Sequence, residues 1–214
     1  MSDIRAKVQQ KNKDRLTDGR FKDLNLLRDG TLVVAKYGMA AALEGALYGV
    51  HFGSVTTPLA TAATTAIAAQ RPMAWLRVPA TRAIIPVLCE IVVESQGATT
   101  QGEIAIARTS NDVGNGTSTA GNTPVALNPY VNVGTSAVVA RYLSTGDCTA
   151  ETDLLELKRF SFAASAVNQQ FTWEPKEWFP ALPGPSSFLI YIGGNAVNFY
   201  ATVIWVEGPP ELAD

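Results

Sequence analysis

The feature that most constrains this chain is a succession of β-type segments from Arg71 onward. Each segment is rich in Val, Ile, Phe, Tyr or Trp and is bounded by Gly, Pro, Asn or Ser, which is typical of strands separated by turns. The alternation is clear in Glu103–Arg108, where both isoleucines fall on one face. The predicted strands are Ala74–Val78, Ile84–Glu94, Glu103–Arg108, Ala137–Leu143, Leu154–Ala163, Gln170–Trp173, Phe188–Ile192 and Asn198–Val206.

This series of strands, without a long helical pattern, predicts an all-β chain folded as an antiparallel β-sandwich of the jelly-roll type. The last two predicted strands are nearly all apolar and are joined by Gly193–Val197, a suitable hairpin connection. We therefore expect them to form a central hairpin that is buried on both faces. Thr109–Asn128 is polar and rich in Gly, so we expect a loop there that either binds a partner or forms a mobile tip.

Charge and composition divide the chain into three parts. Residues 1–30 hold eight basic and five acidic residues, a net charge of +3, which leaves −5 for the remainder. This predicts an extended basic N-terminal arm ahead of an acidic body. Residues 31–70 are rich in Gly, Ala and Thr and are expected to form an extended segment with short strands, including Tyr48–Phe52. Residues 71–214 are then the jelly-roll body. The uncharged stretch at 55–69 is expected to be extended and covered by neighbouring chain.

The arm has two open interpretations. Its apolar residues are too sparse to form a core, so it is either a solvated terminus or a segment that orders on a partner. Because acids interrupt its basic residues, the arm does not favour nucleic-acid binding. The candidate partner-binding residues are its cations, Arg5, Lys7, Lys11, Lys13, Arg15, Arg20, Lys22 and Arg28.

Motifs for catalysis are not evident. His51 is the only histidine and lies in an apolar context, which favours a hydrogen-bonded structural role and excludes a site with several histidines. No serine lies in a Gly-x-Ser-x-Gly motif. We expect Cys89 and Cys148 to be thiols outside any disulfide, and we predict no metal, no cofactor and no enzyme activity. No apolar stretch reaches the roughly 18 residues of a membrane span, and the charged N-terminus does not resemble a secretory signal.

Aromatic residues gather between positions 171 and 180. Exposed tryptophans on a β-sandwich could stack on sugar rings, whereas buried ones would anchor a loop or a contact between subunits, and we favour the second interpretation. The candidate contact aromatics are Trp173, Trp178 and Phe179.

Several short motifs occur in a fixed order between Val55 and Gly208. A Thr/Ala stretch ends in Ala68–Pro72, a turn follows at Val78–Thr81, and Ile84–Ile91 is a strand with an internal proline. A Gly/Thr/Asn loop comes next, and Pro183–Ser187 leads into the last two strands. This order resembles the virion structural proteins of tailed bacteriophages, single jelly-roll proteins that serve as capsid cement, decoration or minor capsid components.

The resemblance implies a structural protein that binds and stabilises the assembled phage capsid. Its expected partners are the major capsid protein and further copies of itself, as a homotrimer, and its expected location is the virion after synthesis in the host cytoplasm. The resemblance carries over no catalytic residue. The alternative is a receptor- or glycan-binding β-sandwich module of a virion or tail, with Trp173, Trp178 and the Thr109–Asn128 loop at the contact.

Overall fold

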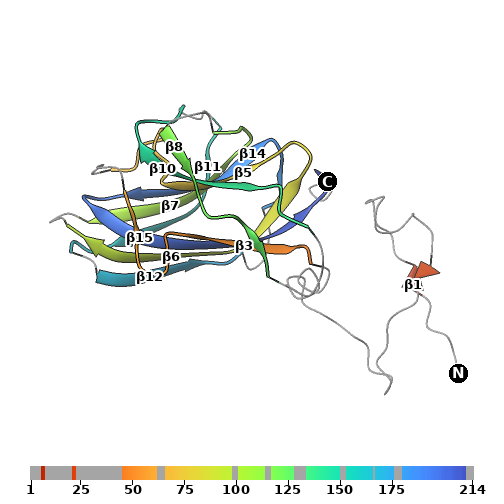
Figure 1. Ribbon diagram of the computed structural model, residues 1–214, viewed down its shortest axis with the longest axis horizontal. Helices are drawn as coiled ribbons and strands as arrows, with labels where there is room; N and C mark the ends of the chain where they lie inside the picture. The colour runs from red at the N-terminus through yellow and green to blue at the C-terminus, as the bar shows by residue number, and fades with distance from the viewer. Residues whose placement is uncertain are drawn as a thin grey trace, which may run out of the picture.

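Two antiparallel β-sheets packed face to face form the body of the protein (Figure 1). The computed structural model describes residues 6–7, 21–22, 45–61, 66–97, 101–113, 117–127, 134–149, 153–165, 167–175 and 180–210. No α-helix occurs within these ranges. The all-β antiparallel sandwich predicted from the sequence is therefore confirmed.

The first sheet has six strands. Their order across the sheet is β11 (Leu155–Phe162), β7 (Gly102–Thr109), β14 (Ser186–Gly193), β5 (Ala74–Val78), β10 (Val139–Thr145) and β8 (Thr117–Ala120).

The second sheet has seven strands. Its main order is β12 (Val167–Trp173), β6 (Ala83–Gln96), β15 (Val197–Gly208), β3 (Leu47–Phe52) and β9 (Val125–Ala126). Two short strands lie off this path, because β13 (Leu182–Pro183) pairs with β6 and β4 (Leu59–Ala60) pairs with β15. The pairing of β3 and β4 with β15 joins residues 47–60 to the same sheet as the later strands.

The core lies between the sheets and follows from the alternation of the strands. Along β15, every second residue from Val197 to Trp205 is buried, while the residues between them are partly exposed on the outer face. β14 differs, because all eight of its residues are buried. Its outward face is covered by residues 66–69, where the Tyr191 hydroxyl donates a hydrogen bond to the Ala69 carbonyl over 3.1 Å. The largest fully buried side chains are Trp75, Trp205, Phe52, Phe188 and Phe199.

The predicted terminal hairpin is wrong. β14 lies between β5 and β7 in the six-stranded sheet, whereas β15 lies between β6 and β3 in the other. The connection at Gly193–Val197 therefore crosses from one layer to the other, with Gly194 at φ 155° and Ala196 at φ 51°. Both strands are central and apolar, as expected, but each obtains its two hydrogen-bonded neighbours within its own sheet, and only β14 is buried on both faces.

The Thr109–Asn128 stretch is also more ordered than a loop. It contains β8, which pairs with β10, and β9, which pairs with β3. Between these strands, the Gly121 amide donates to the Ala140 carbonyl, and further on the Leu127 amide donates to the Leu47 carbonyl. The segment passes from the edge of one sheet to the edge of the other. Backbone pairing holds β8 and β9, while Val113 of the same stretch is buried in the core and Ala126 packs against it.

The expectation for residues 55–69 holds only in part. β4 is extended and Thr61 is buried, but Val55 is 99% exposed in the turn that joins β3 to β4. Positions 62–65 lie outside the described residues, as do positions 31–44 of the expected Gly/Ala/Thr-rich segment.

Candidate functional site

The basic arm is described only in two short strands. β1 (Ala6–Lys7) pairs antiparallel with β2 (Phe21–Lys22), with Ala6 opposite Lys22 and Lys7 opposite Phe21. Two of the eight candidate cations therefore lie on a paired backbone. The other six lie outside the described residues: Arg5, Lys11, Lys13, Arg15, Arg20 and Arg28.

Trp173 is a core residue rather than a surface contact. Its side chain is 7% exposed and stacks on Phe188 of the opposite sheet, with 5.8 Å between ring centroids. This agrees with the interpretation of the aromatics as packing residues and removes Trp173 from the candidate contact set. Trp178 and Phe179 lie outside the described residues.

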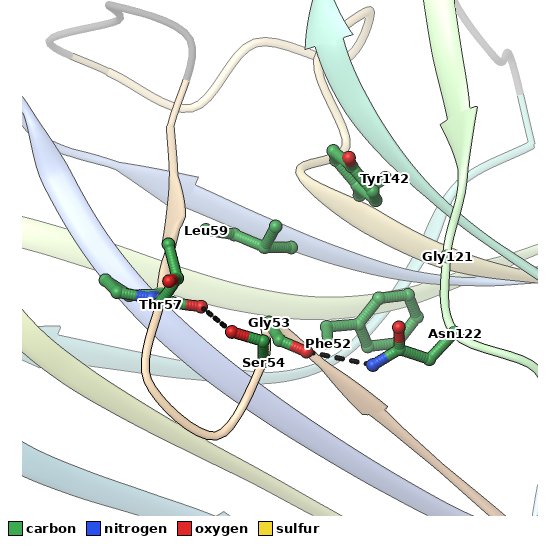
Figure 2. A pocket seen from close by; sticks show the side chains of 9 residues that line it. Phe52, Gly53, Ser54, Thr57, Leu59, Gly121, Asn122 and Tyr142 are labelled. Atoms are coloured by element: carbon green, nitrogen blue, oxygen red, sulfur yellow. Dashed lines mark hydrogen bonds between the residues drawn. The ribbon is translucent and has the colours of Figure 1, made fainter.

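A cavity of about 310 Å³ opens beside the turn between β3 and β4 (Figure 2). Residues from three distant segments form it, because the 121–122 segment and β10 approach the turn from the other sheet. The turn is closed by backbone hydrogen bonds between Ser54 and Thr57. The lining residues are Phe52, Gly53, Ser54, Thr57, Pro58, Leu59, Gly121, Asn122 and Tyr142.

The polar geometry of this cavity is set by Asn122. Its Nδ2 donates to the His51 carbonyl over 2.7 Å and to the Gly53 carbonyl over 2.9 Å, and Figure 2 shows the amide pointing toward Gly53. These bonds satisfy two carbonyls at the end of β3, past its short pairing with β9. The lining residues are all uncharged, so the cavity suits a small neutral group. Sequence reasoning missed it because Asn122 and β3 are about 70 positions apart.

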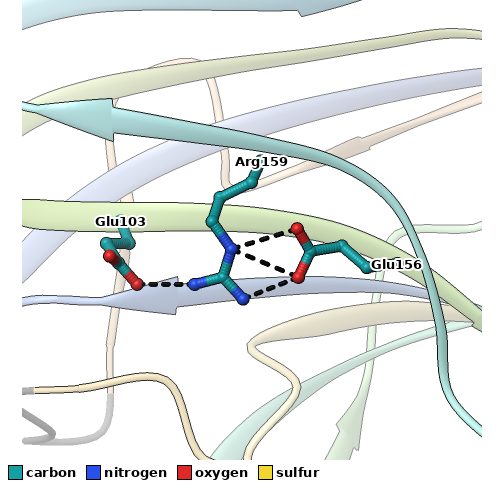
Figure 3. Close-up of polar contacts among 3 residues, drawn as sticks. All are labelled: Glu103, Glu156 and Arg159. Atoms are coloured by element: carbon teal, nitrogen blue, oxygen red, sulfur yellow. Dashed lines mark hydrogen bonds and ion pairs between the residues drawn. The ribbon is translucent and has the colours of Figure 1, made fainter.

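Arg159 on β11 forms an exposed charge cluster (Figure 3). Its guanidinium donates to Glu156 over 2.6 Å through Nη2 and to Glu103 of β7 over 2.7 Å through Nη1. The hydrogen bond from Arg159 lowers the pKa of Glu156 and, in return, Glu156 raises the pKa of Arg159. The cluster therefore keeps both signs of charge ionised on the outermost strand of the six-stranded sheet.

A second carboxylate ties two chain segments together. Asp153, just before β11, accepts hydrogen bonds from the Ser110 amide over 2.7 Å, from Asn111 Nδ2 over 3.3 Å, and from the hydroxyls of Thr109 and Ser110. These bonds, led by the Ser110 hydroxyl, lower the pKa of Asp153 to about 2. The arrangement holds the end of β7 against the start of β11.

Glu207 is a buried acid that sequence reasoning did not single out. It is 8% exposed and accepts hydrogen bonds from the Ala137 amide over 3.0 Å and from Ser136 Oγ over 2.5 Å. Arg82 lies 3.5 Å away and supplies the opposite charge. Because each of these contacts is internal, Glu207 positions residues 136–138 rather than a ligand.

The histidine and the two cysteines, which were considered as candidates for catalysis, make contacts within the fold. His51 Nδ1 is hydrogen-bonded to Thr202 Oγ1 over 2.9 Å and its ring stacks on Tyr200, which confirms the predicted hydrogen-bonded role, although the side chain is exposed. Cys89 and Cys148 are both buried and form no disulfide, as predicted. Burial raises the pKa of Cys89, which disfavours a reactive thiolate.

Neither a metal centre nor a membrane-spanning helix is found in the part of the chain that the structure describes. Within it, no three His, Cys, Asp or Glu residues come together as a set of metal ligands. Likewise, none of the described residues form a helix with the length and apolar character needed to cross a bilayer.

Comparison with protein-family models, with curated proteins and with solved structures yields no match to this chain.

Proposed function

We propose that this protein is a virion structural protein that binds and stabilises an assembled phage capsid, as a cement, decoration or minor capsid component. The observation that carries the proposal is the order in which the strands pair, which supports a jelly roll. Jelly rolls are common in viral capsid proteins, so this is an argument from fold to function.

The pairing order is nested. Eight strands, taken along the chain, are β3, β5, β6, β7, β11, β12, β14 and β15. The first pairs with the last, β5 with β14, β6 with β12, and β7 with β11, each time antiparallel. Rolling up one long hairpin produces this nesting and divides the strands into two facing sheets. β8, β9 and β10 then extend the sheets beyond β5 and β3.

In this proposal the sandwich body and the N-terminal arm have different roles. The rigid sandwich forms a homotrimer through body-to-body contacts, and the basic arm of residues 1–30 docks on the major capsid protein. Binding to the assembled shell stabilises it by mass action, since only the assembled state offers the complete site. A protein with this role would be located in the virion.

Sedimentation of native particles tests the proposal. We expect the protein to travel with a large nucleic-acid-containing particle in a fixed ratio compatible with its symmetry. Deleting residues 1–30 is expected to leave a folded oligomer that no longer binds particles. A protein found only as a small oligomer would contradict the capsid role, and full particle binding by the truncated protein would contradict the role of the arm.

The alternative is a receptor- or glycan-binding module, and the cavity beside Tyr142 is the observation in its favour. An aromatic ring together with the uncharged side chains of Asn122 and Thr57 suits a sugar. A glycan array tests it: binding that is lost in Tyr142→Ala would support the alternative, and a flat response from the wild-type protein would refute it.

A further inference from the structure

The outermost strands of the two sheets differ in how they are protected from further pairing. β8 has four residues and β9 has two, and short strands offer little to a partner. β11 has eight residues but carries the Glu156–Arg159 pair and Lys158. β12 has seven residues, VNQQFTW, with no charge and no proline. Short length and charged residues protect the other described edge strands from pairing with a further strand, whereas β12 has neither.

The outer edge of β12 is open in the described part of the chain. On its inner side, Gln169–Trp173 pairs with Val93–Cys89 of β6 without a break in register. No described strand pairs with its other side, and Figure 1 shows β12 as the margin of its sheet. Among the described residues, the outward backbone N–H and C=O groups of β12 therefore have no strand partner, and they present the pattern that a second strand would pair with.

β12 is also held in place from within the sandwich. Phe171 points inward and packs against Phe160 and Phe162 of β11, with ring centroids 5.5 and 6.1 Å apart. This packing fixes the strand before any partner arrives, so pairing would carry little additional ordering cost. It also turns the alternate residues Gln170 and Thr172 to the exposed face.

We propose that β12 of one copy pairs antiparallel with β12 of a second copy across a two-fold axis at Gln170, joining the seven-stranded sheets of the two molecules. The side chains of β12 favour a second copy as the occupant. Asn168 has φ 52° and departs from extended geometry, so Gln169–Trp173 is the regular part of the strand. Within it, Gln170 and Thr172 are exposed, and each has both a hydrogen-bond donor and an acceptor, so this part can pair with a copy of itself. An axis at Gln170 sets the two Gln170 side chains opposite each other and Gln169 opposite Phe171, without like charges.

This contact is separate from the capsid role and from the three-fold association proposed above. It requires only the described body, and its test counts chains rather than particle binding. The failure of one proposal is therefore distinguishable from the failure of the other.

Disulfide trapping of the full-length protein tests the contact. In Gln170→Cys the two introduced thiols would face each other across the axis at the Cβ spacing of directly opposed residues, about 5 Å. Mild oxidation is expected to give a two-chain band on a non-reducing denaturing gel. Ser161→Cys is the matched control, since it is an exposed position on β11, and the native Cys89 and Cys148 are buried. Equal cross-linking of the two variants, or none, would overturn the proposal.

A charge substitution provides a second test that needs no new cysteine. Gln170→Lys places two ammonium groups opposite each other in the proposed pair, whereas Ser161→Lys adds the same charge to β11. We expect sedimentation equilibrium to show association through β12 at least tenfold weaker for Gln170→Lys, and unchanged for the control. Unchanged association of Gln170→Lys would overturn the proposal, and circular dichroism checks that both variants remain folded.

Discussion

Gly184 lies where the chain passes closely over the β5–β6 connection, and replacing it by alanine tests this packing. Its amide donates to the Arg82 carbonyl over 2.9 Å. A Cβ atom at this position would overlap the Pro79 carbonyl and lie 2.8 Å from the Val78 carbonyl oxygen. Both obstacles are backbone atoms, so no side-chain rotation relieves the overlap. The backbone of Gly184 is outside the left-handed region, so the penalty comes from lack of space alone.

The expected loss follows from the size of the required shift. Added atoms in a well-packed region cost about 1–3 kcal/mol, and backbone obstacles place Gly184→Ala at the upper end. The reduced freedom of the unfolded chain offsets about 0.4–1 kcal/mol of this. A net loss of about 2–2.6 kcal/mol corresponds to a decrease in Tm of about 4–10 °C for a domain of this size.

Urea unfolding followed by tryptophan fluorescence measures the change, with Gly97→Ala as the matched control. A Cβ at Gly97 would lie 3.3 Å from the Ala196 Cβ, at an exposed position, so its free energy of unfolding should stay within about 0.5 kcal/mol of wild type. If Gly184→Ala were as stable as this control, residues 182–185 would not pack over Val78 and Pro79 as described.

Three further substitutions test the polar contacts and the core. Asp153→Asn should lower the free energy of unfolding by about 1 kcal/mol at pH 7. Because the folded-state pKa of Asp153 is lowered to about 2, its contribution is present above its ordinary pKa of 3.8 and is lost as the pH falls through 2, so the wild-type and Asp153→Asn unfolding midpoints should converge between pH 4 and 2. Arg159→Lys should cost no more than about 0.5 kcal/mol, since the Arg159 side chain is 46% exposed, and the difference should vanish in about 1 M salt. Trp173→Ala should cost about 3–5 kcal/mol in urea unfolding, because it empties a buried site against Phe188; a cost below about 1 kcal/mol would place Trp173 at the surface.

Most strands could be located from the sequence, because the residue types that favour a strand and the turn residues that end it are neighbours along the chain. β-type residues bounded by turn residues predicted β5 at Ala74–Val78, with the same bounds as in the structure. The same signals predicted both ends of β6, β7 and β15 to within two residues. In Thr109–Asn128 the same reasoning failed, since β8 has four residues and β9 has two, and the strands that they pair with, β10 and β3, lie elsewhere in the chain. Strands this short are too brief to show a hydrophobic period.

The candidate surfaces depended even more on distant contacts. The cavity at Asn122 and the acceptor role of Asp153 each bring together segments more than 40 positions apart, and no spacing rule links them. The aromatic cluster was visible in the sequence, but whether Trp173 faced solvent or Phe188 depended on which sheet its strand joined.

By itself, then, the sequence determined the all-β class, the positions of the long strands and the separation of a basic arm from an acidic body, because composition and alternation act over a few residues. Only the tertiary structure decided which strands are neighbours. β14 and β15 follow each other along the chain and are equally apolar, yet they lie in different sheets. A strand joins the neighbours that bury both its edges and its apolar face, and those neighbours are set by contacts across the whole chain.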